Sequence, residues 1–192
     1  MKLGIVTLVF VCFLLLALHY PAYGGEKIYL SEEEAPKMVF PEAEEFEVRI
    51  FESTPELREK IKSLIGKAEP SIWEKRYKTF IAKKDSKVIG YAVIVEEIGK
   101  HRPITFIVGV TPEGKTENIA VMVYRESYGS EIRAKRFLKQ YEGKTLDDPI
   151  RTRDDIVNIS GATLSVRAAN VGVKKALALI TIVYLEGENS GD

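Results

Sequence analysis

The segment Ile104 to Val110 reads Ile-Thr-Phe-Ile-Val-Gly-Val and gives the clearest signal of the fold. Its larger apolar residues stand at every second position, namely Ile104, Phe106, Val108 and Val110. A period of two is that of a β-strand, in which alternate side chains point to opposite faces of a sheet. We therefore expect one buried sheet face here, and the clean alternation favours antiparallel neighbours.

Three other segments nearby have the same period and are rich in β-branched and aromatic residues. They cover Lys78 to Lys83, Val88 to Glu96 and Asn118 to Tyr124. Thr111-Pro112-Glu113-Gly114 has the composition of a tight turn, and polar residues at 85–86 and 100–102 supply the other turns. The sequence predicts an antiparallel meander of about four strands.

Helical signals lie on both sides of this meander. Ser53-Thr54-Pro55-Glu56 supplies a capping residue, a proline in the first turn and an acid near the helix start, which predicts a helix to Ile65 that stops at Gly66. Glu131 to Gln140 is also expected to be helical, followed by a charged connector from Asp147 to Asp155. Strands followed by helices indicate an α+β domain.

The last helix is expected to be the longest and to begin at Ser160-Gly161-Ala162-Thr163. Gly187 is suited to cap its end. Its apolar residues fall at helical spacing on one face, which we expect to be buried: Val166, Ala169, Val173, Leu177, Ile180 and Tyr184. Arg167, Lys174 and Lys175 are expected on the opposite, solvated face.

The composition is typical of a folded protein whose positive and negative charges balance, so it has no strong electrostatic field. The 192 residues include 28 Lys plus Arg and 28 Asp plus Glu, so no net charge attracts nucleic acid or an anionic membrane. Two histidines and one cysteine leave little for metal or nucleophilic catalysis, and we assign no role to His101 in its basic turn. The composition thus disfavours hydrolases and nucleic-acid binding.

The N-terminus indicates export. Lys2 precedes an apolar run from Leu3 to Leu18, followed by small residues at Ala22 and Gly24. At about 1.5 Å per residue the run is shorter than a bilayer core of roughly 30 Å, which favours a cleaved signal over an anchor formed by residues 3–18. We divide the chain into a signal peptide or anchor (1–24), an irregular acidic lead-in (25–50), one domain (51–187) and a tail (188–192).

Two interpretations of Ser160 to Thr163 follow from local physics. Ser or Thr before a helix is most often an N-cap, worth about 1 kcal/mol. Alternatively, small residues let a ligand approach the backbone while the N–H groups of the first turn meet a phosphate.

A family resemblance favours the second interpretation. Asp155 to Ala169 reads Asp-Ile-Val-Asn-Ile-Ser-Gly-Ala-Thr-Leu-Ser-Val-Arg-Ala-Ala and resembles the flavinylation motif of the FMN-binding domain family. That family includes flavin subunits of sodium-pumping NADH:quinone reductases and Rnf-type complexes, and NosR-type proteins. Similar pieces occur in the same order elsewhere in the chain: Gly90-Tyr91-Ala92, Pro103 to Val110, Tyr124 to Glu131 and Phe137 to Gln140.

The resemblance implies the cofactor and its site. In the family a flavin transferase moves FMN from FAD onto the motif threonine as a phosphoester, and the matching residue here is Thr163. The remaining implied FMN contacts flank it or lie in a glycine loop: Ser160, Gly161, Ala162, Leu164, Ser165, Glu126, Ser127, Tyr128 and Gly129. The expected protein is an exported electron carrier, membrane-associated through a redox partner, rather than a stand-alone enzyme.

The motif departs from the family at one position. An Asp normally stands six residues before the threonine, where this chain has Val157. Asp155 and Asp154 lie two and three residues further back and are candidates to substitute for it if the connector is flexible. Two alternatives stay open: an exported binding module that has lost flavinylation, and a small reductase with noncovalent flavin.

Overall fold

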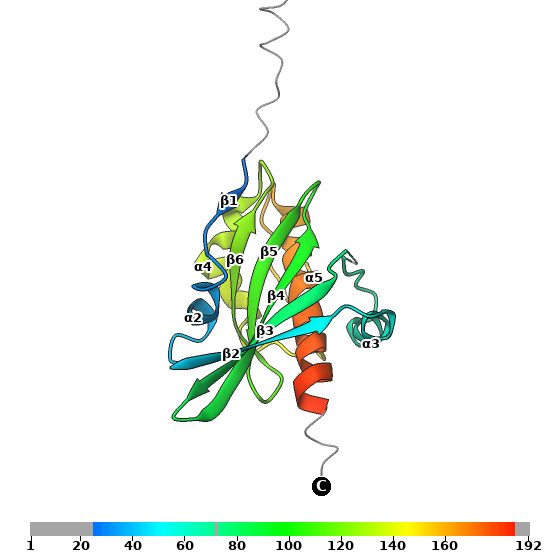
Figure 1. Cartoon of the computed structure of the whole chain (residues 1–192). Helices are drawn as coiled ribbons and strands as arrows, with labels where there is room; N and C mark the ends of the chain where they lie inside the picture. Colours follow the sequence, from blue (N-terminus) through cyan, green and yellow to red (C-terminus); the bar gives the residue numbers. More distant parts are fainter. Residues whose placement is uncertain (1–24, 72, 187–192) are drawn as a thin grey trace, which may run out of the picture.

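The computed structural model describes residues 25–71 and 73–186. The apolar run at residues 3–18, Gly187 and the tail expected at 188–192 lie outside these ranges. Six antiparallel strands form one twisted sheet in the order β1-β6-β5-β4-β3-β2 (Figure 1). Four of them are the expected meander, with ends within two residues of the prediction: β3 (Arg76–Lys84), β4 (Lys87–Ile98), β5 (Pro103–Val110) and β6 (Thr116–Tyr124).

The acidic lead-in is not irregular, which corrects our expectation. It contains β1 (Lys27–Ile28), the short helix α2 (Ala35–Val39) and β2 (Glu45–Glu52), and β2 pairs along its whole length with β3. We expected an irregular segment from its acidic composition, but β2 is a sheet edge, where charged side chains are commonly found. The lead-in is therefore part of the domain and adds two strands to the four expected.

The α+β architecture is confirmed, with helix α5 (Thr163–Ile180) along one face of the sheet (Figure 1). Ile104, Phe106, Val108 and Val110 are all buried in this main core. The opposite face is also partly buried, because α2 packs on β5 and β6. Phe40 lies there against two glycines, and a Cβ built on Gly90 would stand 2.3 Å from its Cζ.

The helical predictions are partly confirmed. Helix α3 (Pro55–Ile65) begins as expected, with the Leu57 N–H donating to Thr54 Oγ1 at 3.2 Å. The helix expected over 131–140 is broken at Ala134, whose ψ of 125° is extended. It becomes three short pieces: η1 (Ser130–Arg133), α4 (Lys135–Leu138) and η2 (Lys139–Tyr141).

One charged residue of α5 is buried where we expected solvent. Lys175 on α5 is fully buried, and its Nζ lies 2.5 Å from Glu74 Oε2 and 2.6 Å from Glu97 Oε1. Glu74 also accepts the Glu96 N–H at 2.7 Å. Helical periodicity placed Lys175 on the polar face but did not show that the loop before β3 covers that face.

Within the described part of the chain, Thr163–Leu185 is the one helical stretch long and apolar enough to span a membrane. Its mean hydropathy is 1.5, and 67% of that window is buried inside the fold. It includes the π-helical end η3 (Thr181–Leu185). The burial identifies this stretch as the core helix of the domain.

Candidate functional site

Two loops and the start of α5 meet at a cleft of about 520 Å³. Eight of the ten predicted site residues line it: Glu126, Ser127, Tyr128, Gly161, Ala162, Thr163, Leu164 and Ser165. The remaining wall is Lys100 and His101, at the tip of the β4–β5 hairpin. The two other predicted residues are Ser160, exposed just before this lining, and Gly129, buried behind it.

Thr163 is the first residue of α5 and is exposed. Its Oγ1 accepts a hydrogen bond from Asn158 Nδ2 at 2.9 Å, which orients the hydroxyl. Ala162 occupies the capping position, and no side chain among the described residues caps the helix. The structure therefore does not support the simple N-cap interpretation, and the N–H groups of the first turn are left for a ligand or water.

The glycine loop packs closely on the first turn of α5. A Cβ on Gly129 would lie 2.7 Å from Ser165 Oγ and 2.8 Å from the Tyr124 hydroxyl, and Gly129 has a φ of 92°. We expected Gly129 to let backbone approach the ligand, whereas the close approach is to the helix. Burial raises the pKa of Tyr124, so its hydroxyl stays protonated and donates to the Tyr128 carbonyl.

The side chains of this loop differ in exposure. Tyr128 is 85% exposed beside the cleft, as expected for a residue that could cover a flat ligand. Glu126 is only 8% exposed, and its Oε1 accepts the N–H of His101 at 2.5 Å and of Arg102 at 2.9 Å. Glu126 or Ser127 was a candidate to bond the polar edge of the ring, and in the structure Glu126 Oε1 holds the hairpin tip.

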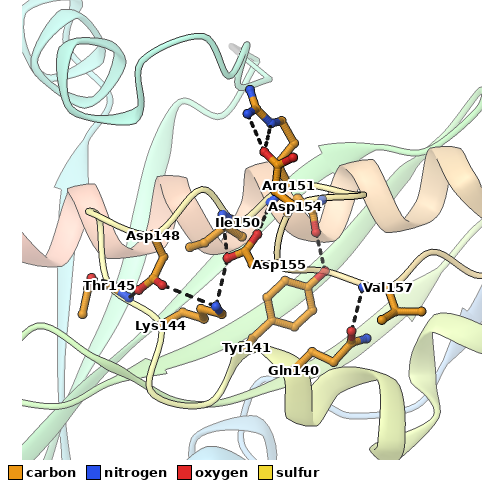
Figure 2. A network of polar contacts seen from close by, with 11 residues as sticks. Gln140, Tyr141, Lys144, Thr145, Asp148, Ile150, Arg151, Asp154, Asp155 and Val157 are labelled. Atoms are coloured by element: carbon orange, nitrogen blue, oxygen red, sulfur yellow. Dashed lines mark hydrogen bonds and ion pairs between the residues drawn. The ribbon is translucent and has the colours of Figure 1, made fainter.

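The connector before Thr163 is fixed by Asp155 (Figure 2). Its carboxylate accepts the N–H of Ile150 at 3.1 Å and of Arg151 at 2.9 Å, and Lys144 Nζ lies 2.9 Å away. Ile150 has a φ of 42°, unusual for a β-branched residue, so these bonds hold a strained backbone in place. Asp155 is therefore not a mobile carboxylate that can replace the motif Asp.

Burial raises the pKa of Asp155, but the Arg151 N–H, the Lys144 ammonium and the Ile150 N–H together outweigh burial and hold the pKa below its ordinary value. The neighbouring Asp154 pairs with Arg151. Val157, at the motif position, is 73% exposed and only its backbone is engaged, donating to Gln140 Oε1 at 2.8 Å. The carboxylates we considered as substitutes are thus already used within the connector.

Thr163 also borders a second hollow, of about 720 Å³. Its walls come from residues 64–69, residues 146–152 and α5. Four basic residues are among them: Lys67, Arg151, Arg167 and Lys174. Acidic residues of the connector, Asp147 and Asp148, line it as well. A group attached to Thr163 could therefore extend in either of two directions.

Sequence reasoning missed three residues at the cleft: Lys100, His101 and Asn158. Asn158 carried a usable signal, since a short amide side chain five residues before the motif threonine lies within reach across a turn. Lys100 and His101 carried none, because their position depends on a contact with Glu126, 24 to 25 residues away.

Fold and site together describe a small α+β domain in which an uncapped helix start borders a cleft. Residues 99–178 match the model of the FMN-binding domain family, which is the family that the motif at Asp155 to Ala169 had indicated. The comparisons indicate FMN as the cofactor.

Two individual proteins are similar to this chain, one in sequence and one in structure. The chain is 30% identical over 109 residues to a subunit of the proton-translocating ferredoxin:NAD(+) oxidoreductase complex of Clostridium ljungdahlii, and the match covers 53% of this chain and 59% of that protein. The chain thus matches somewhat over half of that relative. The crystal structure of NqrC from Shewanella oneidensis has the same fold, with a TM-score of 0.56 at 14% identity over 81% of this chain and 88% of that one.

The residues of the cleft suit FMN by their chemistry. The uncapped first turn of α5 and the nearby Lys100 offer N–H groups and positive charge to a phosphate. Tyr128 and Leu164 present apolar surface for a flat ring, and the cleft volume lies in the range of small-molecule sites.

Proposed function

We propose that this chain is an exported electron-transfer subunit that carries FMN esterified to Thr163 and exchanges electrons with a membrane redox complex. The observation that carries the proposal is the exposed Thr163 hydroxyl at an uncapped helix start inside a cleft. The similar protein of Clostridium ljungdahlii is named as a subunit of a proton-translocating oxidoreductase complex, which supports an assembly of this kind. Residues 1–24 would direct export, and we favour a signal peptide that is cleaved over one that stays as a membrane anchor.

Attachment would follow the family chemistry through a flavin transferase. A bond forms between Thr163 Oγ1 and the phosphorus of the FMN half of FAD, and the P–O–P bond of FAD breaks. AMP leaves with the bridging oxygen, and the hydroxyl proton passes to a base of the transferase. The resulting phosphodiester keeps one negative charge, for which a helix start is worth about 0.3–1 kcal/mol.

The chain's own residues would then hold and shield the cofactor. FMN supplies the one- and two-electron chemistry. Asn158 orients the Thr163 oxygen, the first turn of α5 binds the phosphate, and Tyr128 covers the ring in the 520 Å³ cleft. We favour this cleft over the larger hollow because eight of the ten predicted site residues line the cleft, whereas Thr163 alone of them borders the hollow.

A denaturing gel tests the proposal. The chain is coexpressed with a flavin transferase, exported, purified and examined for flavin fluorescence after denaturation. We expect a fluorescent band in the wild type and in Ser160→Ala, which removes the neighbouring exposed hydroxyl, and none in Thr163→Val. Thr163→Ser keeps the nucleophilic oxygen and should load.

The alternatives give different results in the same experiment. Fluorescence that persists in Thr163→Val would refute the attachment site. A native protein that is yellow but loses flavin on denaturation would be a noncovalent reductase, and a colourless one would be a binding module. N-terminal sequencing of the exported protein gives the signal boundary, which we place near residue 24.

A further inference from the structure

The tip of the β4–β5 hairpin, residues 99–102, brings positive charge to the cleft wall that faces the first turn of α5. It reads Gly99-Lys100-His101-Arg102, and Lys100 and His101 line the cleft. We propose that this tip sets the reduction potential of FMN, with Lys100 supplying the charge and Glu126 acting as its positioning residue. This inference rests on the proposed function.

The contact with Glu126 is built into the fold. One buried carboxylate oxygen accepts two consecutive N–H groups, those of His101 and Arg102. The glycine at the start of the tip makes room for this contact, since a Cβ on Gly99 would lie 2.9 Å from the same oxygen. Hydrogen bonds to an ionised acceptor are stronger than neutral ones, so the tip is held more firmly than an ordinary turn.

The other hairpin turns lack such an anchor among the described residues. The β5–β6 turn is held by bonds within itself, such as the Thr111 N–H to the Lys115 carbonyl at 2.7 Å. The β3–β4 turn receives one exposed bond, from the Asp85 N–H to Glu44 Oε2 at 3.2 Å. Among the three described hairpin turns between β3 and β6, the one that a buried carboxylate holds is thus the turn beside the cleft.

The electrostatic consequence follows from the charges around the cleft. Reduction adds negative charge to the cofactor, so a fixed cation favours the reduced form over the oxidised form. Glu126 opposes this effect, but two N–H donors already satisfy one of its oxygens. Lys100 is exposed at the rim of the cleft, within the lining that a bound cofactor would meet.

The test measures the midpoint potential of the FMN-loaded protein by spectroelectrochemical titration. Lys100→Gln should lower the preference for reduced over oxidised FMN by up to tenfold, which is a fall of about 30 mV for a two-electron couple. Lys87→Gln is the matched control, because Lys87 begins the same strand, about 40 Å from the tip. An equal potential in wild type and both variants would overturn the proposal.

The role of Glu126 needs a second measurement, independent of the cofactor. In the apoprotein of Glu126→Ala, amide hydrogen exchange at His101 and Arg102 should become faster while exchange across the strand pairs of β4 and β5 is unchanged. In that background Lys100→Gln should lose most of its effect on the potential, because the tip is no longer held. A full effect of Lys100→Gln in both backgrounds would refute the positioning role.

Failure of this inference differs from failure of the proposed function. If no flavin is retained on Thr163, the gel experiment has already failed. If flavin is retained and the potentials do not move, the function stands and the role of the tip is refuted.

Discussion

Helix α5 has two regions that differ in burial and in what satisfies their polar groups. Its first turn is exposed at Thr163 and Leu164, and no described side chain caps it. The body of the helix is buried on nearly every side, and its Lys175 ammonium is shared between Glu74 and Glu97. The body fixes the position of the helix, whereas the first turn remains free to meet a ligand.

The largest expected effect comes from the buried body. Lys175→Met leaves two buried carboxylates without their cation, and breaking such a cluster costs about 3–5 kcal/mol. We expect the free energy of unfolding of the apoprotein, measured by urea denaturation at pH 8, to fall by this amount. Lys174→Met, next to it and half-buried, is the control and should cost far less.

This loss should depend on pH. Burial raises the pKa of Glu74. The Lys175 ammonium acts against this rise, and the Glu97 carboxylate adds to it. Removing Lys175 raises this folded-state pKa further above the unfolded value of about 4.3, so the folded state gains relative stability as pH falls through it. Part of the loss should be recovered at pH 5, and an equal loss at pH 5 and pH 8 would contradict this account.

A smaller effect is expected in the connector that leads to the first turn. Asp155→Asn keeps the shape but removes the charge that binds Lys144 and two N–H groups, at a cost of about 1.5 kcal/mol. The exposed Asp147→Asn is the control. Because the folded-state pKa of Asp155 is lowered, its contribution is present above pH 4 and is lost as pH falls through that pKa.

Unfolding curves at several pH values check this prediction. The difference between wild type and Asp155→Asn should shrink steadily from pH 5 towards pH 2. A constant difference over that range would show that the charge of Asp155 does not stabilise the connector.

The sequence predicted what local patterns encode. Alternation in Ile104 to Val110 gave the central strand, and Thr54 and Gly66 gave both ends of α3. The prediction missed β2 although it carried a usable signal, since Phe46, Val48 and Ile50 alternate with charged residues as in a strand that is an edge of the sheet. The burial of Lys175 was not predicted because a helical period shows which residues share a face but not what packs against that face.

At the site, too, the features encoded locally were predicted and those that depend on distant contacts were not. The motif at Ser160 to Thr163 is contiguous, so its position at a helix start followed from sequence. The position of the hairpin tip could not be predicted from the sequence. It depends on Glu126, which follows the end of β6 and accepts hydrogen bonds from two backbone N–H groups of the tip. Asp155 was misjudged for a similar reason, since its partners Lys144 and Ile150 lie in a folded connector with unusual dihedral angles.

Val157→Asp is expected to have the smallest effect on stability and to change the rate at which FMN is attached. Val157 stands where the family motif has an Asp, and its side chain is largely exposed, with only the backbone N–H engaged. Val157→Asp should therefore fit without repacking and change the free energy of unfolding by no more than about 0.5 kcal/mol. Because the structure shows Asp155 committed to the connector, an added carboxylate at 157 should speed FMN transfer severalfold.

A time course of gel fluorescence with the flavin transferase and FAD measures that rate. Val157→Asn is the matched control, because it has the same size as Asp and lacks the charge. If both variants load at the wild-type rate, the transferase does not read position 157, and recognition must depend on the helix start itself. Faster loading in Val157→Asp alone would assign recognition to position 157, six residues before Thr163.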